Sequence, residues 1–401
     1  MKKAKFLIYA AVAATAAIVS SCSNEDVVEQ TPQKGRPIVV EASVDGDSRA
    51  SVATSFTGFK LYGYKDDANK TNFLDGVNFA NSGSSWVSVG SANWPEGSGN
   101  CNFYAISTQG AAEAPEGIDI TDLKNGTFSY TVPTNVAEQK DILVANQNNV
   151  AYADNAGKIK LGFKHALANV QLKLRFNHSE YSTKDDPTGN IRAGYKYAIQ
   201  YVTLHNVKTT GTYNASTGWD TSEGTLSNVT INFDGGNRDV EPSLILTAAK
   251  GTTSNKIPYQ DVAVDANSIM VIPQTLEHVD GFGTANPMNN YNGNAAYIEI
   301  HGVMWDPANS SYWDDEDGEE VEVSLEGSTP WSAHDHVSDF SYKLSNTIDS
   351  HRCVSIYLPL PEALNFDINK KYTLRMNLYN FKKGDGQDAF EAATITSPTN
   401  P

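Results

Sequence analysis

The stretch Val170-Gln171-Leu172-Lys173-Leu174-Arg175-Phe176 decides the fold class of this 401-residue chain. Apolar residues occupy every second position of the stretch, and Gln, Lys and Arg occupy the positions between them. Successive side chains of a β-strand point to opposite faces, so the pattern predicts a strand with one buried face and one solvent-exposed face. Similar patterns recur along most of the chain.

Short runs rich in β-branched and aromatic residues, bounded by Gly, Asn, Asp, Ser and Pro, predict the other strands. They cover residues 38–44, 59–64, 103–107, 128–132, 159–163, 197–207, 229–233, 244–247, 269–272, 297–303, 321–325, 354–358 and 372–378. No segment keeps a helical apolar period over about 12 residues, so helices should be few and short. The chain is therefore predicted to be all-β, with two antiparallel β-sandwich-like domains.

The N-terminus has the layout of an export signal. Met1-Lys2-Lys3-Ala4-Lys5 is basic, and an apolar run covers residues 6–19. This run is shorter than the roughly 20 residues that a helix needs to cross a bilayer. Val19-Ser20-Ser21-Cys22 then places small residues directly before a cysteine.

This arrangement resembles the lipobox of bacterial lipoproteins, in which the cysteine is lipidated and the chain is cleaved before it. The resemblance implies that residues 1–21 are a lipoprotein signal peptide and that lipid on Cys22 anchors the chain to the outer membrane. Ser23-Asn24-Glu25-Asp26 also resembles short acidic signals for cell-surface export. The alternative is an ordinary secretory signal with a coincidental cysteine. Residues 22–36 are polar and without periodicity, as expected of a tether.

The charge balance is acidic, with 30 Lys and Arg against 47 Asp and Glu and a formal net charge of −17. Nucleic acid and anionic membrane surfaces are therefore disfavoured partners. Besides Cys22 the chain contains only Cys101 and Cys353. These two cysteines lie in different predicted domains, so two buried thiols are favoured over a disulfide.

No established catalytic signature occurs in the sequence. It lacks HExxH, GxSxG, a Walker-type phosphate loop, GxGxxG after a strand and CxxC. The chain is therefore not expected to be an enzyme, and no cofactor is expected. His334 and His336 can share a metal if they lie on a strand, and the acidic run at residues 314–320 contains part of a calcium-loop spacing. For both segments a solvated loop is the favoured interpretation.

Three tryptophans, Trp305, Trp313 and Trp331, fall within one loop-rich segment. Exposed aromatic rings can stack on sugar rings or contact a protein partner. The alternative, which is favoured, is that these rings cover the core of their own domain. The segment motivates a rival hypothesis, a lipid-anchored surface protein that binds glycans or adheres without polymerising.

A series of motifs in chain order resembles the fimbrillins, the pilins and accessory subunits of the lipoprotein-derived type V pili of anaerobic gut and mouth bacteria. The most specific motif is Phe163-Lys164-His165-Ala166-Leu167-Ala168-Asn169-Val170. The others are residues 38–44, Asp47-Ser48-Arg49-Ala50, residues 59–64, Trp94-Pro95, residues 102–107, residues 139–145, the set Val207, Gly211 and Trp219, and residues 271–276.

The resemblance implies a structural or accessory subunit of a pilus at the cell surface. Residues 22–49 would form the lipid tether and a removable first strand, residues 50–163 the N-terminal domain and residues 164–401 the C-terminal domain. In family members that polymerise, an arginine-specific protease cuts after the first strand. Arg49 lies at that place, and cleavage would leave Ala50 as the new N-terminus. The alternative interpretation of Arg49 is a solvated loop arginine.

Removal of the first strand would expose unpaired backbone groups flanked by apolar pockets, which a strand of another subunit can fill. The displaced side chains would be those of Ile38, Val40, Ala42 and Val44. The donor strand of the family is C-terminal, but this chain ends in Ser397-Pro398-Thr399-Asn400-Pro401. Proline donates no ladder hydrogen bond, so the last four residues are expected to be poor strand. A tip, anchor or minor subunit is therefore as consistent with the sequence as a stalk subunit.

Overall fold

The part of the chain that the structure describes is built from β-strands, short loops and two 3-10 turns, Leu123–Asn125 and Val136–Glu138. It is a computed structural model that describes residues 35–44, 56–83, 85–97, 99–154, 156–176, 196–236, 240–248, 259–264, 267–278, 293–305, 310–314, 319–323, 351–360, 364–378 and 394–399. The prediction of an all-β fold is confirmed. Among these residues no helix is both long and apolar enough to span a bilayer.

The strands fall on either side of the motif around His165. Before it lie β1 (Val39–Val44), β2 (Gly58–Lys65), β3 (Asn72–Asn81), β4 (Trp86–Ser88), β5 (Cys101–Thr108), β6 (Ile118–Asp119), β7 (Thr127–Thr131), β8 (Ile142–Val150) and β9 (Lys158–His165). After it lie β10 (Ala168–Phe176), β11 (Lys196–Lys208), β12 (Thr210–Asn214), β13 (Gly218–Asp220), β14 (Leu226–Asn232), β15 (Leu244–Thr247), β16 (Gln260–Ala263), β17 (Ile269–Val271), β18 (Gln274–Thr275), β19 (Tyr297–Trp305), β20 (Ser310–Asp314), β21 (Glu319–Val323), β22 (His351–Pro359), β23 (Asn365–Phe366), β24 (Lys371–Leu378) and β25 (Thr394–Thr399).

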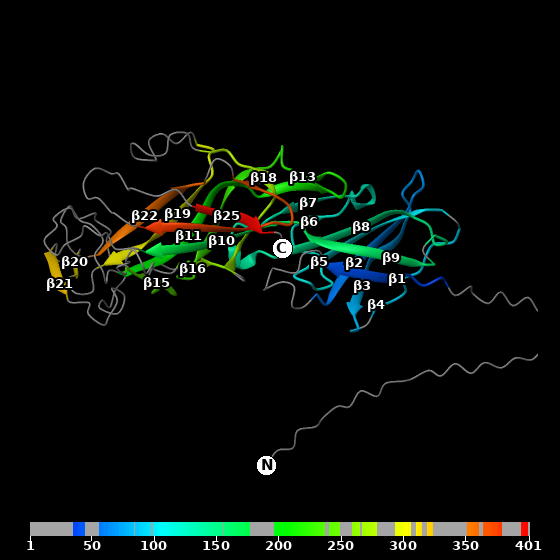
Figure 1. Ribbon diagram of the computed structural model, residues 1–401, viewed down its shortest axis with the longest axis horizontal. Coiled ribbons are helices and arrows are strands. Elements are labelled where there is room, and N and C mark those ends of the chain that lie inside the picture. The colour runs from blue at the N-terminus through cyan, green and yellow to red at the C-terminus, as the bar shows by residue number, and fades with distance from the viewer. Residues whose placement is uncertain are drawn as a thin grey trace, which may run out of the picture. The chain divides into compact units, whose positions relative to one another are not determined.

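Seven strands close into a barrel in the order β1-β4-β3-β2-β5-β8-β9 (Figure 1). The ring closes at β1, which runs parallel to β9 and antiparallel to β4. Closure leaves the barrel without an open sheet edge. The interior is filled by side chains that include the fully buried rings of Phe59, Phe79, Phe103 and Phe163.

Two sheets that share one core make up a sandwich. One sheet has the order β16-β10-β24-β25, with β17 also on β10, and the other has the order β14-β11-β19-β22, with β15 also on β11. In β10 the side chains of Val170, Leu172 and Leu174 are fully buried in this core, as their alternation predicts. The opposite face of β10 is only partly exposed, because Gln171 is buried and Lys173 forms an ion pair with Asp261 at 2.6 Å.

A third sheet, in the order β13-β12-β7-β6, joins strands from both sides of the predicted domain boundary. Its central pair runs antiparallel from Thr210↔Thr131 to Asn214↔Thr127. Residues Arg36–Pro401 together form one compact unit. The division into domains at residues 163 and 164 therefore stays a prediction, and the strands on either side of it share a sheet.

The motif around His165 leads the chain from the barrel into the sandwich. β9 ends at His165 and β10 begins at Ala168, with Ala166 and Leu167 fully buried between them. The indole N–H of Trp219 donates to the Ala166 carbonyl at 2.6 Å. The ring Nδ1 of His165 lies 2.5 Å from a carboxylate oxygen of Asp141, and both side chains are buried. Two polar contacts, Trp219 with Ala166 and His165 with Asp141, thus stabilise a connection that is otherwise apolar.

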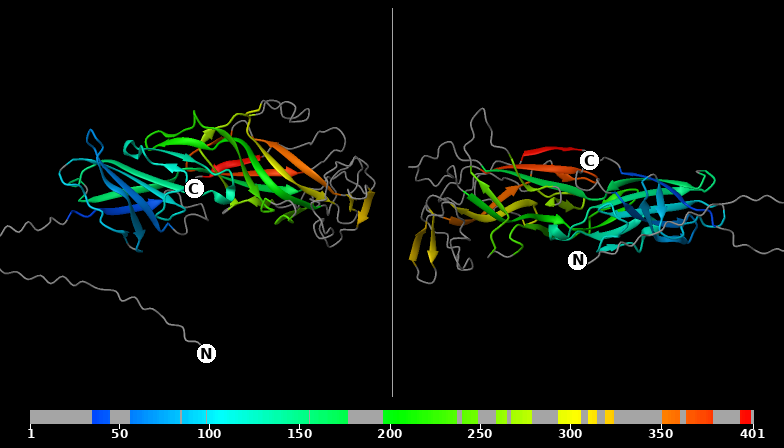
Figure 2. Two further views of the ribbon diagram at one scale, coloured as in Figure 1. Left: turned by 180° about the vertical axis from the view of Figure 1, so that it is seen from behind. Right: turned by 90° about the horizontal axis from the view of Figure 1, so that it is seen from below.

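The C-terminal strand corrects one prediction. Thr394–Thr399 forms β25, which pairs antiparallel with β24 at the edge of its sheet (Figure 2). The expectation of poor strand is therefore wrong for Pro398 and Thr399, whereas Asn400 and Pro401 lie outside the described residues. Thr396 pairs with Thr373 and Thr399 with Lys371, which leaves Ser397 and Pro398 opposite the single residue Tyr372. An edge strand with an extra residue is where a sheet accommodates proline.

Cys101 is a free and buried thiol in β5, as predicted. Burial raises its pKa to about 11. Cys353 lies on β22 in a different sheet, opposite Val303 of β19, and its side chain is outside the described part.

Gly302 on β19 offers a test of the sandwich core. A Cβ atom at this position would overlap the carbonyl oxygen of Ala198 on β11, whereas a Cβ at Gly99 would meet nothing within 4 Å. Overpacking of this kind costs about 1–3 kcal/mol or more. We expect Gly302→Ala to lower the urea midpoint clearly, with Gly99→Ala as the matched control that leaves it unchanged. Equal midpoints for the two variants would contradict the packing of β11 on β19.

Candidate functional site

The candidate site is the place that β1 occupies in the barrel wall. Its inward side chains are Ile38, Val40, Ala42 and Val44; the first two are 6% and 4% exposed, and the other two are partly buried against the same core. Val39, Glu41 and Ser43 point outward and are exposed. The inward set is the one that the alternation of the sequence predicts. Displacement of the strand stays a prediction.

Backbone pairing holds β1 unequally on its two sides. Toward β9 the parallel register is continuous from Val39↔Lys158 to Val44↔Phe163, whereas toward β4 it consists of the single pair Val40↔Trp86. Loss of β1 would therefore leave β9 unpaired on this side from Lys158 to Phe163. Such an edge readily accepts another strand.

The N-terminal end of β1 is anchored from both sides. The Ile38 N–H donates to the Ala92 carbonyl at 2.9 Å, and the Val39 N–H donates to the Gly157 carbonyl at 3.1 Å. Just before the strand, the Arg36 guanidinium lies 4.5 Å from the centre of the Tyr152 ring. These contacts fix where the strand enters the barrel wall and therefore its register.

Aromatic rings line the barrel interior beneath β1. The Phe56 ring lies 4.8 Å from that of Phe163 and 4.9 Å from that of Trp86, and Phe59 lies 5.1 Å from Phe163, measured between ring centroids. Ala42 and Val44 pack against the same cluster. The surface under β1 is therefore apolar, and removal of the strand would expose it to water at a cost of about 25 cal/mol per Å².

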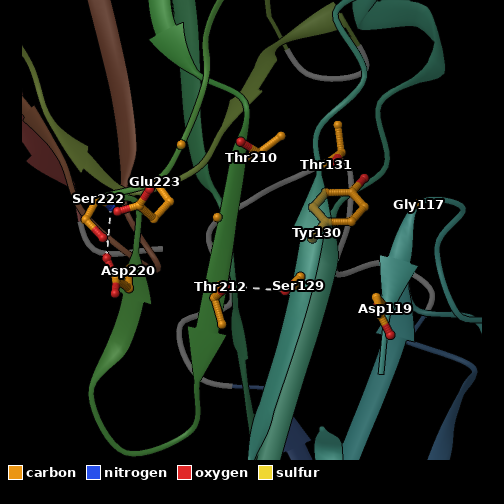
Figure 3. Close-up of a pocket in the computed structure, with 12 residues that line it drawn as sticks. Gly117, Asp119, Ser129, Tyr130, Thr131, Thr210, Thr212, Asp220, Ser222 and Glu223 are labelled. Atoms are coloured by element: carbon orange, nitrogen blue, oxygen red, sulfur yellow. Dashed lines mark hydrogen bonds between the residues drawn. The ribbon is translucent and has the colours of Figure 1, made fainter. Parts of the chain in front are cut away.

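A second surface feature is a polar groove of about 320 Å³ across the sheet β13-β12-β7-β6 (Figure 3). Its floor carries the hydroxyls of Ser129 and Thr131 on β7 and of Thr210 and Thr212 on β12. The Ser129 and Thr212 hydroxyl oxygens are 3.2 Å apart and share a hydrogen bond. Hydroxyl-bearing residues at alternate positions of two neighbouring strands thus make one polar surface.

Carboxylates flank this groove, with Asp119 on one side and Asp220 and Glu223 on the other (Figure 3). Hydrogen bonds from the Thr121 hydroxyl and N–H lower the pKa of Asp119, and hydrogen bonds from the Ser222 N–H and hydroxyl lower the pKa of Asp220. No Lys or Arg lines the groove among the described residues. Its chemistry suits hydroxyl- or ammonium-bearing groups rather than anions.

The sequence contains little that indicates this groove. The only local signal is the alternation of Thr and Ser in Thr127-Phe128-Ser129-Tyr130-Thr131 and in Thr210-Gly211-Thr212. Neither run shows that the two strands pair, because Ser129 and Thr212 are 83 residues apart along the chain. Only the strand pairing brings these hydroxyls together.

Several predicted site residues lie outside the described residues. These are Cys22, Arg49, Ala50, Trp331, His334 and His336. Trp305 ends β19 and Trp313 lies on β20, but the side chains of both are outside the description. Lipidation, processing and ligand binding by these tryptophans therefore stay predictions. Within the described part of the chain, no three His, Cys, Asp or Glu side chains are placed to hold a metal ion.

Fold and site together define an all-β protein in which a β-sandwich follows a barrel that the N-terminal strand completes. The profile of the fimbrillin-like family matches residues 48–396. The chain belongs to this family, as the motifs of its sequence indicate.

Solved structures similar to this one include fimbrial and adhesion proteins. A fimbrial protein from Bacteroides vulgatus shares the fold, with a TM-score of 0.52 at 12% identity, covering 90% of this chain and 99% of that one. A candidate cell adhesion protein from Bacteroides ovatus gives 0.44 at 13% identity, covering 90% and 95%. The tip fimbrial protein Mfa3 from Porphyromonas gingivalis, with a C-terminal truncation, gives 0.29 at 10% identity, covering 85% and 94%. No curated protein matches the sequence.

The two faces of β1 can be tested separately. Val40 is 4% exposed and Val39 is 45% exposed, and they are neighbours on one strand. We expect Val40→Ala to lower the free energy of unfolding by about 1–3 kcal/mol through lost burial, and Val39→Ala to change it by less than about 0.5 kcal/mol. Urea unfolding followed by tryptophan fluorescence measures both. A similar effect of the two variants would show that β1 is not packed as described.

Proposed function

We propose that this chain is a structural or accessory subunit of a fimbrillin-type pilus, exported as a lipoprotein, cleaved after Arg49 and assembled by strand exchange. The observation that carries the proposal is the position of β1, which closes the barrel along its full length on β9. Membership of the fimbrillin-like family supports it. The fimbrial protein from Bacteroides vulgatus, which shares the fold, is consistent with it.

In this proposal lipid on Cys22 first holds the subunit at the outer membrane. The polar residues 22–36 then separate the lipid from the barrel. Arg36 and Ile38, which are held by Tyr152 and Ala92, mark where this tether ends and the folded chain begins. The subunit would thus be displayed at the cell surface with β1 in place.

Cleavage after Arg49 would cut the covalent link between β1 and the rest of the barrel. The strand would then be held by backbone hydrogen bonds, worth about 0.5–1.5 kcal/mol net each, and by burial, worth about 1.5–3 kcal/mol for a fully buried Val or Ile. An empty site would expose the β9 edge and the aromatic rings beneath it. A strand from a neighbouring subunit restores both kinds of contact and is therefore favoured over an open site.

A non-polymerising adhesive protein on the same lipid anchor is the second candidate function. In the sequence this hypothesis rests on Trp305, Trp313 and Trp331, whose side chains are outside the described part of the chain. The observation that favours an adhesive function is the polar groove between Asp119 and Asp220. This groove offers hydroxyl and carboxylate groups to a ligand. If the protein is adhesive in this way, its partners are host or microbial glycans or proteins. The two candidates differ in whether cleavage produces oligomers.

Cleavage gives the main test. We expect an arginine-specific protease to cut the purified precursor to a new N-terminus at Ala50, and the cut chain to form oligomers in size-exclusion chromatography. Arg49→Gln should prevent both results. Arg36→Gln is the matched control and should permit both, because Arg36 precedes β1. Cut chains that remain monomeric would remove the strand-exchange proposal and leave the adhesive alternative.

The lipid anchor is tested in the native cells. We expect Cys22→Ser to abolish incorporation of labelled palmitate and to release the chain from the membrane fraction, because several acyl chains hold a protein firmly at a bilayer. Cys101→Ser, which changes a buried thiol, is the matched control and should incorporate the label normally. Equal labelling of both variants would show that Cys22 is not the lipidated residue.

A further inference from the structure

We infer that the β1 site selects the strand of another subunit by charge as well as by shape. Two lysines on the outer face of β9, Lys158 and Lys160, favour a carboxylate at the position that Glu41 occupies. The inference rests on the proposed function and specifies the chemistry of the partner strand.

The charged contact follows from the parallel register of β1 and β9. Lys158 and Lys160 point outward between the buried residues Ile159 and Leu161. Glu41 is in register with Lys160, and its carboxylate lies 3.2 Å from the Lys158 ammonium. Lys160 is exposed and forms no ion pair within the described part of the chain. Glu41 therefore pairs with Lys158 and is in register with Lys160, and a lysine in its place would add a positive charge beside both.

Apolar contacts add a shape requirement on both faces of the strand. Inside, the site holds larger side chains at Ile38 and Val40 and a small one at Ala42. Outside, the antiparallel pair Val40↔Trp86 places Val39 next to Val87, and these two valines are 45% and 51% exposed. A replacing strand that takes the register of β1 is therefore expected to carry apolar residues at these positions.

The chain's own C-terminal strand does not meet these requirements. β25 has the sequence Thr394-Ile395-Thr396-Ser397-Pro398-Thr399, with no acidic residue and no alternating apolar pattern. It is also already paired with β24. β25 is therefore a poor candidate for the β1 site, which fits an extended segment with apolar residues at alternate positions and an acidic residue between them.

Competition between peptides tests this inference. The chain cut after Arg49 is incubated with a fluorescent peptide of residues 38–44, and its uptake into the barrel is followed by anisotropy. We expect the Glu41→Lys peptide to compete about two- to fivefold less well, since like charges in neighbouring strands are destabilising and this pair is half exposed to solvent. The peptide of residues 394–399 should compete at least as poorly. In the protein variant Lys158→Glu/Lys160→Glu, the preference for glutamate over lysine should reverse.

A double variant of lysines elsewhere in the chain controls for the change in net charge. Lys124→Glu/Lys140→Glu changes the net charge equally at exposed lysines outside β9 and should leave the preference unchanged. Equal competition by the unmodified peptide and the Glu41→Lys peptide would overturn the charge selection and leave strand exchange intact. No uptake of the unmodified peptide would overturn both proposals.

The uncut chain gives a second readout that does not depend on the protease. There we expect Glu41→Lys to lower the unfolding midpoint more than Glu41→Gln does, and Lys158→Glu/Lys160→Glu to reverse that order. Additive effects of the changes on the two strands would contradict a charge contact between β1 and β9.

Discussion

The parallel pairing of β1 with β9 is the contact on which the barrel depends. Every other neighbouring pair of barrel strands is antiparallel, and β4 contributes only one register pair to β1. Without β1 the wall would end at β9, with unpaired backbone groups above an aromatic interior. The strand that completes the barrel is also the first one of the fold. A single chain segment, between Val44 and Gly58, joins β1 to the rest of the barrel.

The strand that receives β1 also connects the barrel to the sandwich. β9 continues through the buried residues Ala166 and Leu167 into β10, which again runs parallel to a late strand, β24. The shared sheet of β7 and β12 and the buried contact between Asp141 and His165 reinforce this connection. Continuous backbone thus links the strand that receives β1 directly to the core of the sandwich.

Alternation of apolar and polar residues identified many of the strands, because strands such as β7 and β9 bury one face and expose the other. It failed where this condition does not hold. β3 contains Asp75 and Gly76 and leaves much of its length partly exposed, and β4 is only three residues long. β25 contains Pro398, which a register shift at a sheet edge accommodates. These strands depend on the neighbours they pair with more than on their own pattern.

The sequence by itself determined which residues form many of the strands and which side chains of β1 point inward, since alternation is a property of a single strand. It also indicated the family, which is read from local motifs. Only the tertiary structure decided that β1 closes a barrel on β9, that hydroxyls of β7 and β12 form one groove, and that Glu41 meets Lys158, 117 residues away. The physical reason is that a strand's pattern sets its faces, whereas its partner is chosen by backbone and core contacts among segments far apart in the chain.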